Sequence, residues 1–188
     1  KIAFADGQEY PASMKKKDNN TGLAVISISK SIIQSSTLEV AKAAVLGTSG
    51  SSLSGSPIIA LGRPMGTEDS ICYGNITSVG NAIKLPDSNY KYMTTDIYGS
   101  VNASGVLINL NGQIVGIIDM SHNSSDLKNL ISAVGITELK KVVESLSNDS
   151  DIAYFGVYGT DVTQEANSKM GVPFGAYITE IDMDSPAM

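Results

Sequence analysis

Residues 105–118 read GVLINLNGQIVGII, and in this stretch two apolar runs flank the pair Asn111-Gly112. Asn-Gly between apolar runs is the strongest short-range signal for a β-hairpin, because both residues accept the positive φ angles of a two-residue turn. Similar short segments, separated by turn residues, recur along most of the chain. They lie at 1–5, 9–14, 22–28, 57–61, 71–79, 92–95, 105–110 and 114–118. Many short strands at this spacing predict an all-β barrel or sandwich, not a βαβ fold.

An amphipathic pattern indicates one helix after these strands. Its apolar residues are spaced i, i+3, i+4 and i+7, and they are Leu139, Val142, Val143 and Leu146. Thr137 stands before them, where an N-cap residue is expected. The polar run 148–151 reads as a linker, and strand-like segments resume at 153–158 and 177–181. Residues 184–188 have the pattern of a helix start, so we expect one domain followed by the beginning of another.

Composition excludes several classes of function. The formal net charge of −6 argues against a general nucleic-acid binder, which normally presents a basic face. The sequence has no apolar run of about 18 residues that could span a membrane, and its strand-like opening does not resemble a signal peptide. Cys72 is the single cysteine, so no internal disulfide is expected, and its alternating surroundings favour a core or strand position. We expect no cofactor and no metal site.

Seven segments, in this order, resemble the HtrA/Do-like family of trypsin-fold serine proteases. They are FADGQEYPA (4–12), DNNTGLAVI (18–26), IALGRPMG (59–66), GNITSVG (74–80), TTD (94–96), LINLNG with IVGI (107–112 and 114–117) and YFGV (154–157). Each segment is short, but together they cover nearly the whole chain with consistent spacing.

The resemblance implies an all-β fold, in which residues 1–148 form a trypsin-like double β-barrel with one C-terminal helix. The first barrel would be incomplete, with its end at about residues 1–35 and its histidine-bearing part absent. Residues 152–188 would form the N-terminal part of a PDZ domain. Such a domain holds the C-terminal carboxylate of a peptide on backbone N–H groups. The loop that matches in type consists of Tyr154, Phe155, Gly156 and Val157.

The resemblance also places the residues that should orient and activate a catalytic serine. The family reads D-x-x-x-D-L-A-V-L, and its second aspartate orients the histidine base; here Gly22 takes that position, while Asp18 keeps the first. Loss of the orienting charge alone costs about 10⁴ in rate in the template enzyme. Asp18 is a less favoured substitute. The family histidine stands about thirty residues earlier, before Lys1. The only histidine, His122, is expected in a solvated polar loop.

The nucleophile position depends on the alignment register, because the chain is one residue shorter than the family between Asp96 and Asn109. Counting forward from Asp96 gives Ser104, which we favour, and counting back from Asn109 gives Ala103. In the Ser104 register Asn102 replaces the glycine of the oxyanion hole, which Asn102 and Ser104 would form. Asparagine adopts the required backbone conformation less readily than glycine.

The sequence therefore predicts a catalytically inactive homologue of an HtrA/Do-like serine protease. The parent's PDZ domain would bind polypeptide clients or peptide C-termini in protein quality control. Two alternatives stay open: an active serine endopeptidase completed by an upstream histidine segment, and a purely structural interaction module. The resemblance implies a bacterial cell-envelope or secreted location and a homo-oligomer in the parent.

Overall fold

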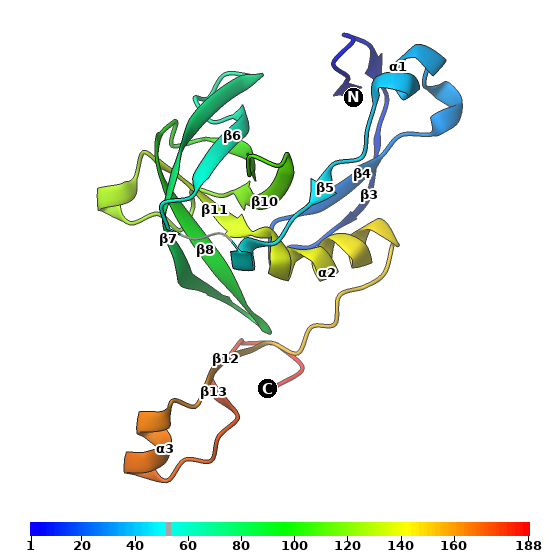
Figure 1. Cartoon of the computed structure of the whole chain (residues 1–188). Helices are drawn as coiled ribbons and strands as arrows, with labels where there is room; N and C mark the ends of the chain where they lie inside the picture. The colour runs from blue at the N-terminus through cyan, green and yellow to red at the C-terminus, as the bar shows by residue number, and fades with distance from the viewer. Residues whose placement is uncertain (52–53) are drawn as a thin grey trace.

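The computed structural model of the chain describes residues 1–51 and 54–188. At its centre six strands close into a barrel (Figure 1), with the order β11-β8-β7-β6-β9-β10 and a β10–β11 pairing that completes the ring. The strands are β6 (Pro57–Arg63), β7 (Ser70–Leu85), β8 (Ser88–Tyr98), β9 (Ser104–Ile108), β10 (Gln113–Ile118) and β11 (Leu130–Gly135). All six neighbouring pairs are antiparallel. The predicted all-β barrel is confirmed.

The Asn111-Gly112 hairpin joins β9 to β10 as the sequence predicts. Gly112 has a φ angle of 72°, the left-handed conformation that glycine adopts without a steric penalty. The Asn109 side-chain oxygen accepts the backbone N–H groups of Asn111 and Gln113, each at 3.0 Å. The turn is thus fixed by backbone geometry and by one side chain that satisfies two amides.

Apolar side chains from every strand fill the barrel interior. Ala60, Met93, Leu107, Ile131 and Ala133 have no exposed surface. Full burial of a large side chain such as leucine or methionine contributes about 1.5–3 kcal/mol. The barrel core therefore provides most of the hydrophobic stabilisation. Cys72 packs against this core and is partly buried, which confirms the predicted strand position.

The N-terminal segment forms two separate hairpins. β1 (Ile2–Ala3) pairs with β2 (Glu9–Tyr10), and β3 (Ser13–Lys17) pairs with β4 (Ala24–Ser27), both antiparallel. A short helix, α1 (Ser35–Val40), follows, and β5 (Val45–Leu46) then adds to β10 in parallel. The fold prediction contained one helix, so α1 is an addition to it.

Helix α2 (Ile136–Ser147) confirms the predicted helix, but its cap differs. Gly135 is the N-cap residue and makes no side-chain cap bond. Thr137 Oγ1 instead accepts hydrogen bonds from the backbone N–H of Ser49 at 2.8 Å and from Ser49 Oγ at 2.9 Å. Ser49 is fully buried, so this residue of the Gly-, Ser- and Thr-rich 47–55 segment packs on the start of α2. Residues 52 and 53 of that segment lie outside the described residues.

A second apolar cluster joins α2 to the barrel and to the β3–β4 hairpin. Ile83, Tyr90, Tyr92, Ile136 and Leu139 are its buried members, and Leu23 from the β3–β4 turn packs against them. Helix α2 also contacts β3 and β4 directly. This cluster places the β3–β4 turn beside the barrel, and the site described below lies at that junction.

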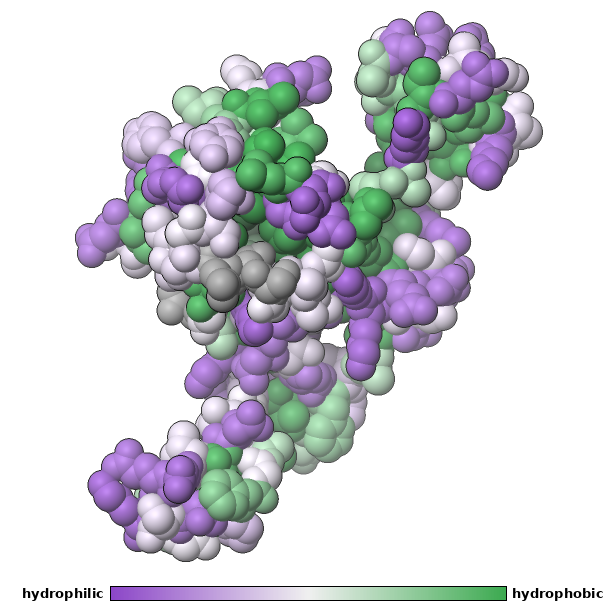
Figure 2. All heavy atoms as spheres, viewed as in Figure 1, coloured by the Kyte–Doolittle hydropathy of each residue, from purple (hydrophilic) through white to green (hydrophobic). Residues whose placement is uncertain are grey.

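The C-terminal segment forms a separate lobe, which follows α2 in Figure 1 and projects at the lower left of Figure 2. It contains β12 (Val157–Asp161), α3 (Gln164–Met170) and β13 (Ala176–Ile181), with β12 and β13 antiparallel. Every residue of β13 is exposed, so this lobe buries far less apolar surface than the barrel. Residues 183–187 form turns and a bend, not the expected helix start.

Candidate functional site

The turn between β3 and β4 carries the position at which the family aspartate is expected. The Asp18 carboxylate accepts the backbone N–H of Asn20 at 3.3 Å, the backbone N–H of Thr21 at 2.9 Å and Thr21 Oγ1 at 2.6 Å. Asp18 is thus engaged within its own turn. Gly22 has a φ angle of 71°, and a Cβ built there would meet nothing within 4 Å. The space for a side chain is present, but the backbone conformation favours glycine.

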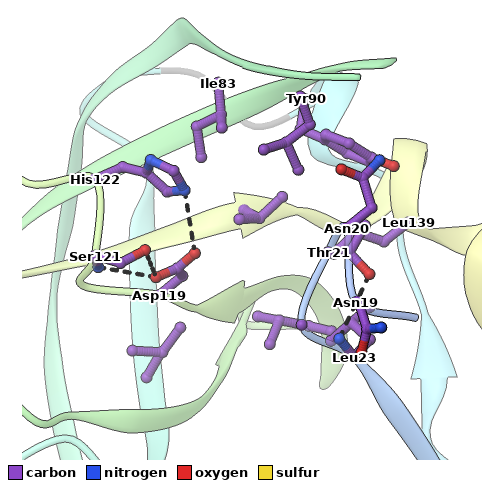
Figure 3. Close-up of a pocket in the computed structure, with 15 residues that line it drawn as sticks. Asn19, Asn20, Thr21, Leu23, Ile83, Tyr90, Asp119, Ser121, His122 and Leu139 are labelled. Atoms are coloured by element: carbon purple, nitrogen blue, oxygen red, sulfur yellow. Dashed lines mark hydrogen bonds and ion pairs between the residues drawn. The ribbon is translucent and has the colours of Figure 1, made fainter. Parts of the chain in front are cut away.

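Gly22 lines a cavity of about 600 Å³ between this turn and the barrel (Figure 3). Its walls combine the 19–23 turn, the β7–β8 hairpin, the loop after β10 and α2. Apolar side chains make up much of the wall: Leu23, Ile83, Leu85, Ile117, Ile118, Val134 and Leu139. Asp119, Ser121 and His122 form a polar group at one side. The fold therefore brings Gly22 and His122, far apart in the sequence, to one cavity.

The polar group at this cavity has an order of contacts unlike that of a catalytic triad. His122 Nε2 lies 3.7 Å from Asp119 Oδ2, while Ser121 Oγ donates to Asp119 Oδ1 at 2.6 Å. In a triad the serine hydroxyl donates to the histidine, and the aspartate contacts only the histidine. Here the serine hydroxyl donates its hydrogen bond to the carboxylate instead. The sequence analysis did not single out Asp119 and Ser121, although both precede His122 in the motif DMSHN.

Tyr92 fixes the loop that carries His122. Its hydroxyl donates to the Asp119 carbonyl and to Asn123 Oδ1, both at 2.8 Å. Its ring meets the His122 ring edge to face, with centroids 6.0 Å apart. Burial, with a further contribution from the charge of Asp119, raises the pKa of Tyr92 to about 12. The phenol therefore stays protonated and remains a donor at neutral pH. His122 still lies at the surface, with 40% of its side chain exposed.

The candidate nucleophile lies in a different place, at the start of β9. Ser104 is the first residue of β9, is exposed and lies opposite Arg63. Ala103, the alternative, is 9% exposed and belongs to the barrel core. Among the described residues that line the cavity of Gly22 and His122, neither Ser104 nor Ala103 occurs. The fold thus brings two of the predicted site residues together and leaves the candidate nucleophile outside.

One of the two amides that would form an oxyanion hole, that of Asn102, is used inside the same turn. The backbone N–H of Asn102 donates to Ser100 Oγ at 3.2 Å, and that of Ala103 donates to the Ser100 carbonyl at 3.0 Å. Gly105 anchors the following strand with a φ angle of 134°, and a Cβ there would overlap the Leu61 carbonyl oxygen. An oxyanion hole requires free donors aimed at the developing negative charge. The Asn102 amide is not free in this way, because it already has an acceptor within the turn.

The 154–157 loop does converge on a carboxylate, and that carboxylate belongs to the same chain. Phe155 N–H donates to Asp87 Oδ2 at 2.7 Å, Gly156 N–H to Asp87 Oδ1 at 3.0 Å, and Val157 N–H to Asp87 Oδ1 at 3.1 Å. Gly156 has a φ angle of 86°, which turns the three amides to one side. Tyr154 at the loop start donates to Asp182 Oδ2 at 2.5 Å, and this bond raises the pKa of Tyr154 to about 12.

The closed antiparallel six-stranded barrel, preceded by hairpins and followed by a helix, is consistent with one barrel of a trypsin-like domain. The family model of the trypsin-like peptidase domain matches residues 1–117, and the chain belongs to this family. Within the described residues, no three His, Cys, Asp or Glu side chains are grouped to hold a metal ion.

Similar proteins carry HtrA and DegP names. The chain is 29% identical over 205 residues to "Serine protease Do-like HtrA" of Bacillus subtilis, covering 100% of this chain and 44% of that protein. It is 28% identical over 193 residues to "Probable periplasmic serine endoprotease DegP-like" of Halomonas elongata, covering 99% of this chain and 39% of that protein. The chain thus spans about two fifths of the length of these curated relatives.

Solved structures agree on the fold. "HtrA-type protease AlgW with decapeptide" superposes with a TM-score of 0.66 at 24% identity, covering 98% of this chain and 56% of that chain. No helix in the described part of the molecule is both long and apolar enough to cross a membrane.

Proposed function

We propose that this chain is part of an HtrA/Do-like serine protease homologue that does not cleave peptide bonds through Ser104, and that its 154–157 loop holds peptide C-termini in the complete PDZ domain of the parent protein. One observation supports the first part of this proposal, the absence of cleavage through Ser104. The position of the orienting acid is Gly22, which shares a cavity with His122, and Ser104 does not line that cavity in the part of the chain that is described. A base brought to Ser104 from another segment would still lack its orienting carboxylate, at a cost of about 10⁴ in rate.

Both alignment registers lead to the same proposal. In the first, Ser104 has a hydroxyl, but the neighbouring amides of Asn102 and Ala103 are bonded to Ser100. In the second, the nucleophile position is Ala103, which has no hydroxyl at all. Residues 1–148 would then serve as a protease-like scaffold, and residues 152–188 as the first part of a PDZ domain.

The peptide-binding half rests on the geometry of the 154–157 loop. Three consecutive amides already hold a carboxylate at 2.7–3.1 Å, which is the chemistry needed to capture a peptide C-terminus. A similar protein, AlgW, is described with a decapeptide, and several relatives are named periplasmic. We therefore infer polypeptide clients and a bacterial envelope location.

Proteolysis of an unfolded substrate tests the first half. Fluorescently quenched casein would be incubated with the chain and with Ser104→Ala, beside an active trypsin-like protease. We expect both forms of the chain to give the same background rate. A rate that exceeds the background and is lost in Ser104→Ala would favour the alternative of an active endopeptidase.

A further inference from the structure

The Asp87 carboxylate sits where a peptide carboxylate would sit. It accepts three backbone N–H groups in succession, from Phe155, Gly156 and Val157. Asp87 also donates its own backbone N–H to the Val157 carbonyl at 2.8 Å. A peptide bound by strand addition with its C-terminus in a loop of amides makes the same two kinds of contact. One residue thus reproduces both elements of ligand recognition.

The residue that supplies this carboxylate is held in place from several sides. Asp87 lies at the tip of the β7–β8 hairpin with a φ angle of 64°. Next to it, Asn89 Nδ2 donates to the Gly159 carbonyl on β12 at 3.1 Å. On the other side, Asn20 Nδ2 donates to the Pro86 carbonyl at 2.9 Å. The hairpin tip therefore bridges the turn that carries Gly22 and the lobe that carries the 154–157 loop.

The lowered pKa of Asp87 fits a carboxylate that binds to the 154–157 loop. Partial burial raises the pKa of Asp87, but the N–H groups of Gly156, Phe155 and Val157 together outweigh this effect and hold the pKa below its ordinary value. The carboxylate is therefore charged at neutral pH. A hydrogen bond to a charged group is about twice as strong as one between neutral groups.

We propose that Asp87 is an internal ligand of the 154–157 loop, so that a peptide C-terminus binds only when the β7–β8 hairpin withdraws. The inference rests on the peptide-binding function proposed above. Peptide carboxylate and Asp87 carboxylate compete for the same three amides. The apparent affinity for peptide is then the intrinsic affinity multiplied by the fraction of molecules in which Asp87 has left the loop.

Two variants of the parent protein with its complete PDZ domain test this proposal. Asp87→Gly removes the carboxylate and suits the positive φ angle of 64°. Asp69→Gly is the matched control, because Asp69 has a φ angle of 56° in the turn that joins β6 to β7. The first readout is amide hydrogen exchange at Phe155, Gly156 and Val157 by NMR. We expect faster exchange at these amides in Asp87→Gly and no change in Asp69→Gly.

The second readout is binding of a labelled heptapeptide with an apolar free-acid C-terminus, beside the same peptide with an amidated end. We expect the free acid to bind Asp87→Gly at least about tenfold more tightly than the unaltered chain, a change of about 1.4 kcal/mol. The amidated peptide should bind neither. Equal exchange at the three amides, or equal peptide affinity for both proteins, would overturn the proposal. If exchange increases in Asp87→Gly but neither protein binds the free acid, the internal ligand stands and the peptide-binding function fails.

Discussion

Restoring the missing acid with Gly22→Asp should destabilise the chain slightly and should not create a protease. Gly22 has a φ angle of 71°, with open space where a Cβ would lie, so the cost is backbone strain alone. An L-residue in this region costs about 1–2 kcal/mol. Replacing glycine also lowers the entropy of the unfolded chain, which returns about 0.4–1 kcal/mol. The net expectation is a loss of about 1 kcal/mol, or about 2–4 °C in Tm.

Two other glycines calibrate this estimate. Gly7 has a φ angle of 80° and equally open space, so Gly7→Asp should cost about the same. Gly105→Ala should cost far more, because its Cβ would overlap the Leu61 carbonyl oxygen. Urea unfolding followed by circular dichroism gives all three values. A gain in stability for Gly22→Asp, or a loss as large as that of Gly105→Ala, would refute the reasoning.

The functional half of this prediction uses the same protein. Gly22→Asp should remain inactive on casein, because Ser104 does not line the cavity that the new carboxylate would share with His122. Activity in Gly22→Asp that disappears in the double variant with Ser104→Ala would show that the glycine is the only defect. It would also show that a histidine reaches Ser104.

Three further predictions concern stability and pH. Leu107→Ala should lower the free energy of unfolding by about 2–5 kcal/mol, since Leu107 is fully buried, while Leu110→Ala, at a 63% exposed position, should change it little in urea titrations. Ser49→Ala should cost about 1–3 kcal/mol, because it leaves the buried polar contact with Thr137 unmade; an unchanged midpoint would contradict this. The pKa of Asp87 is lowered in the fold, so its stabilising contact should be complete above the ordinary pKa of about 3.9 and lost as pH falls through the lower folded value. NMR shifts of the 154–157 amides that stay constant throughout this acid range would count against the contact.

The barrel could be predicted from sequence because its strands carry local signals. Alternating apolar residues and the Asn111-Gly112 turn act over a few residues, and the structure confirms them. Strand β11 was missed because its sequence, LISAVG, mixes small and polar residues with apolar ones. Ser132 is fully buried there, and its Oγ donates to the Leu130 carbonyl at 3.3 Å. Helices α1 and α3 are too short for a helical period to be recognised in their sequences.

The site could be predicted only in part. Family spacing led to Gly22 and to the 154–157 loop, but no local pattern shows that Gly22 and His122 line one cavity. Their shared cavity arises from tertiary packing of the β3–β4 turn on α2 and the barrel. Asp87 was missed as well, because an aspartate after a proline reads as an ordinary turn residue. The choice between Ser104 and Ala103 as the nucleophile position stays a prediction.

The central claim, that Ser104 is not an activated nucleophile, is tested most directly by a fluorophosphonate probe. The folded chain and Ser104→Ala would be treated side by side, with an active trypsin-like protease as the positive control, and adducts located by peptide mass spectrometry. The account predicts labelling of the control protease and no adduct on either form of the chain. An adduct on Ser104 that is absent from Ser104→Ala would contradict it and establish an active serine whose base and acid lie elsewhere.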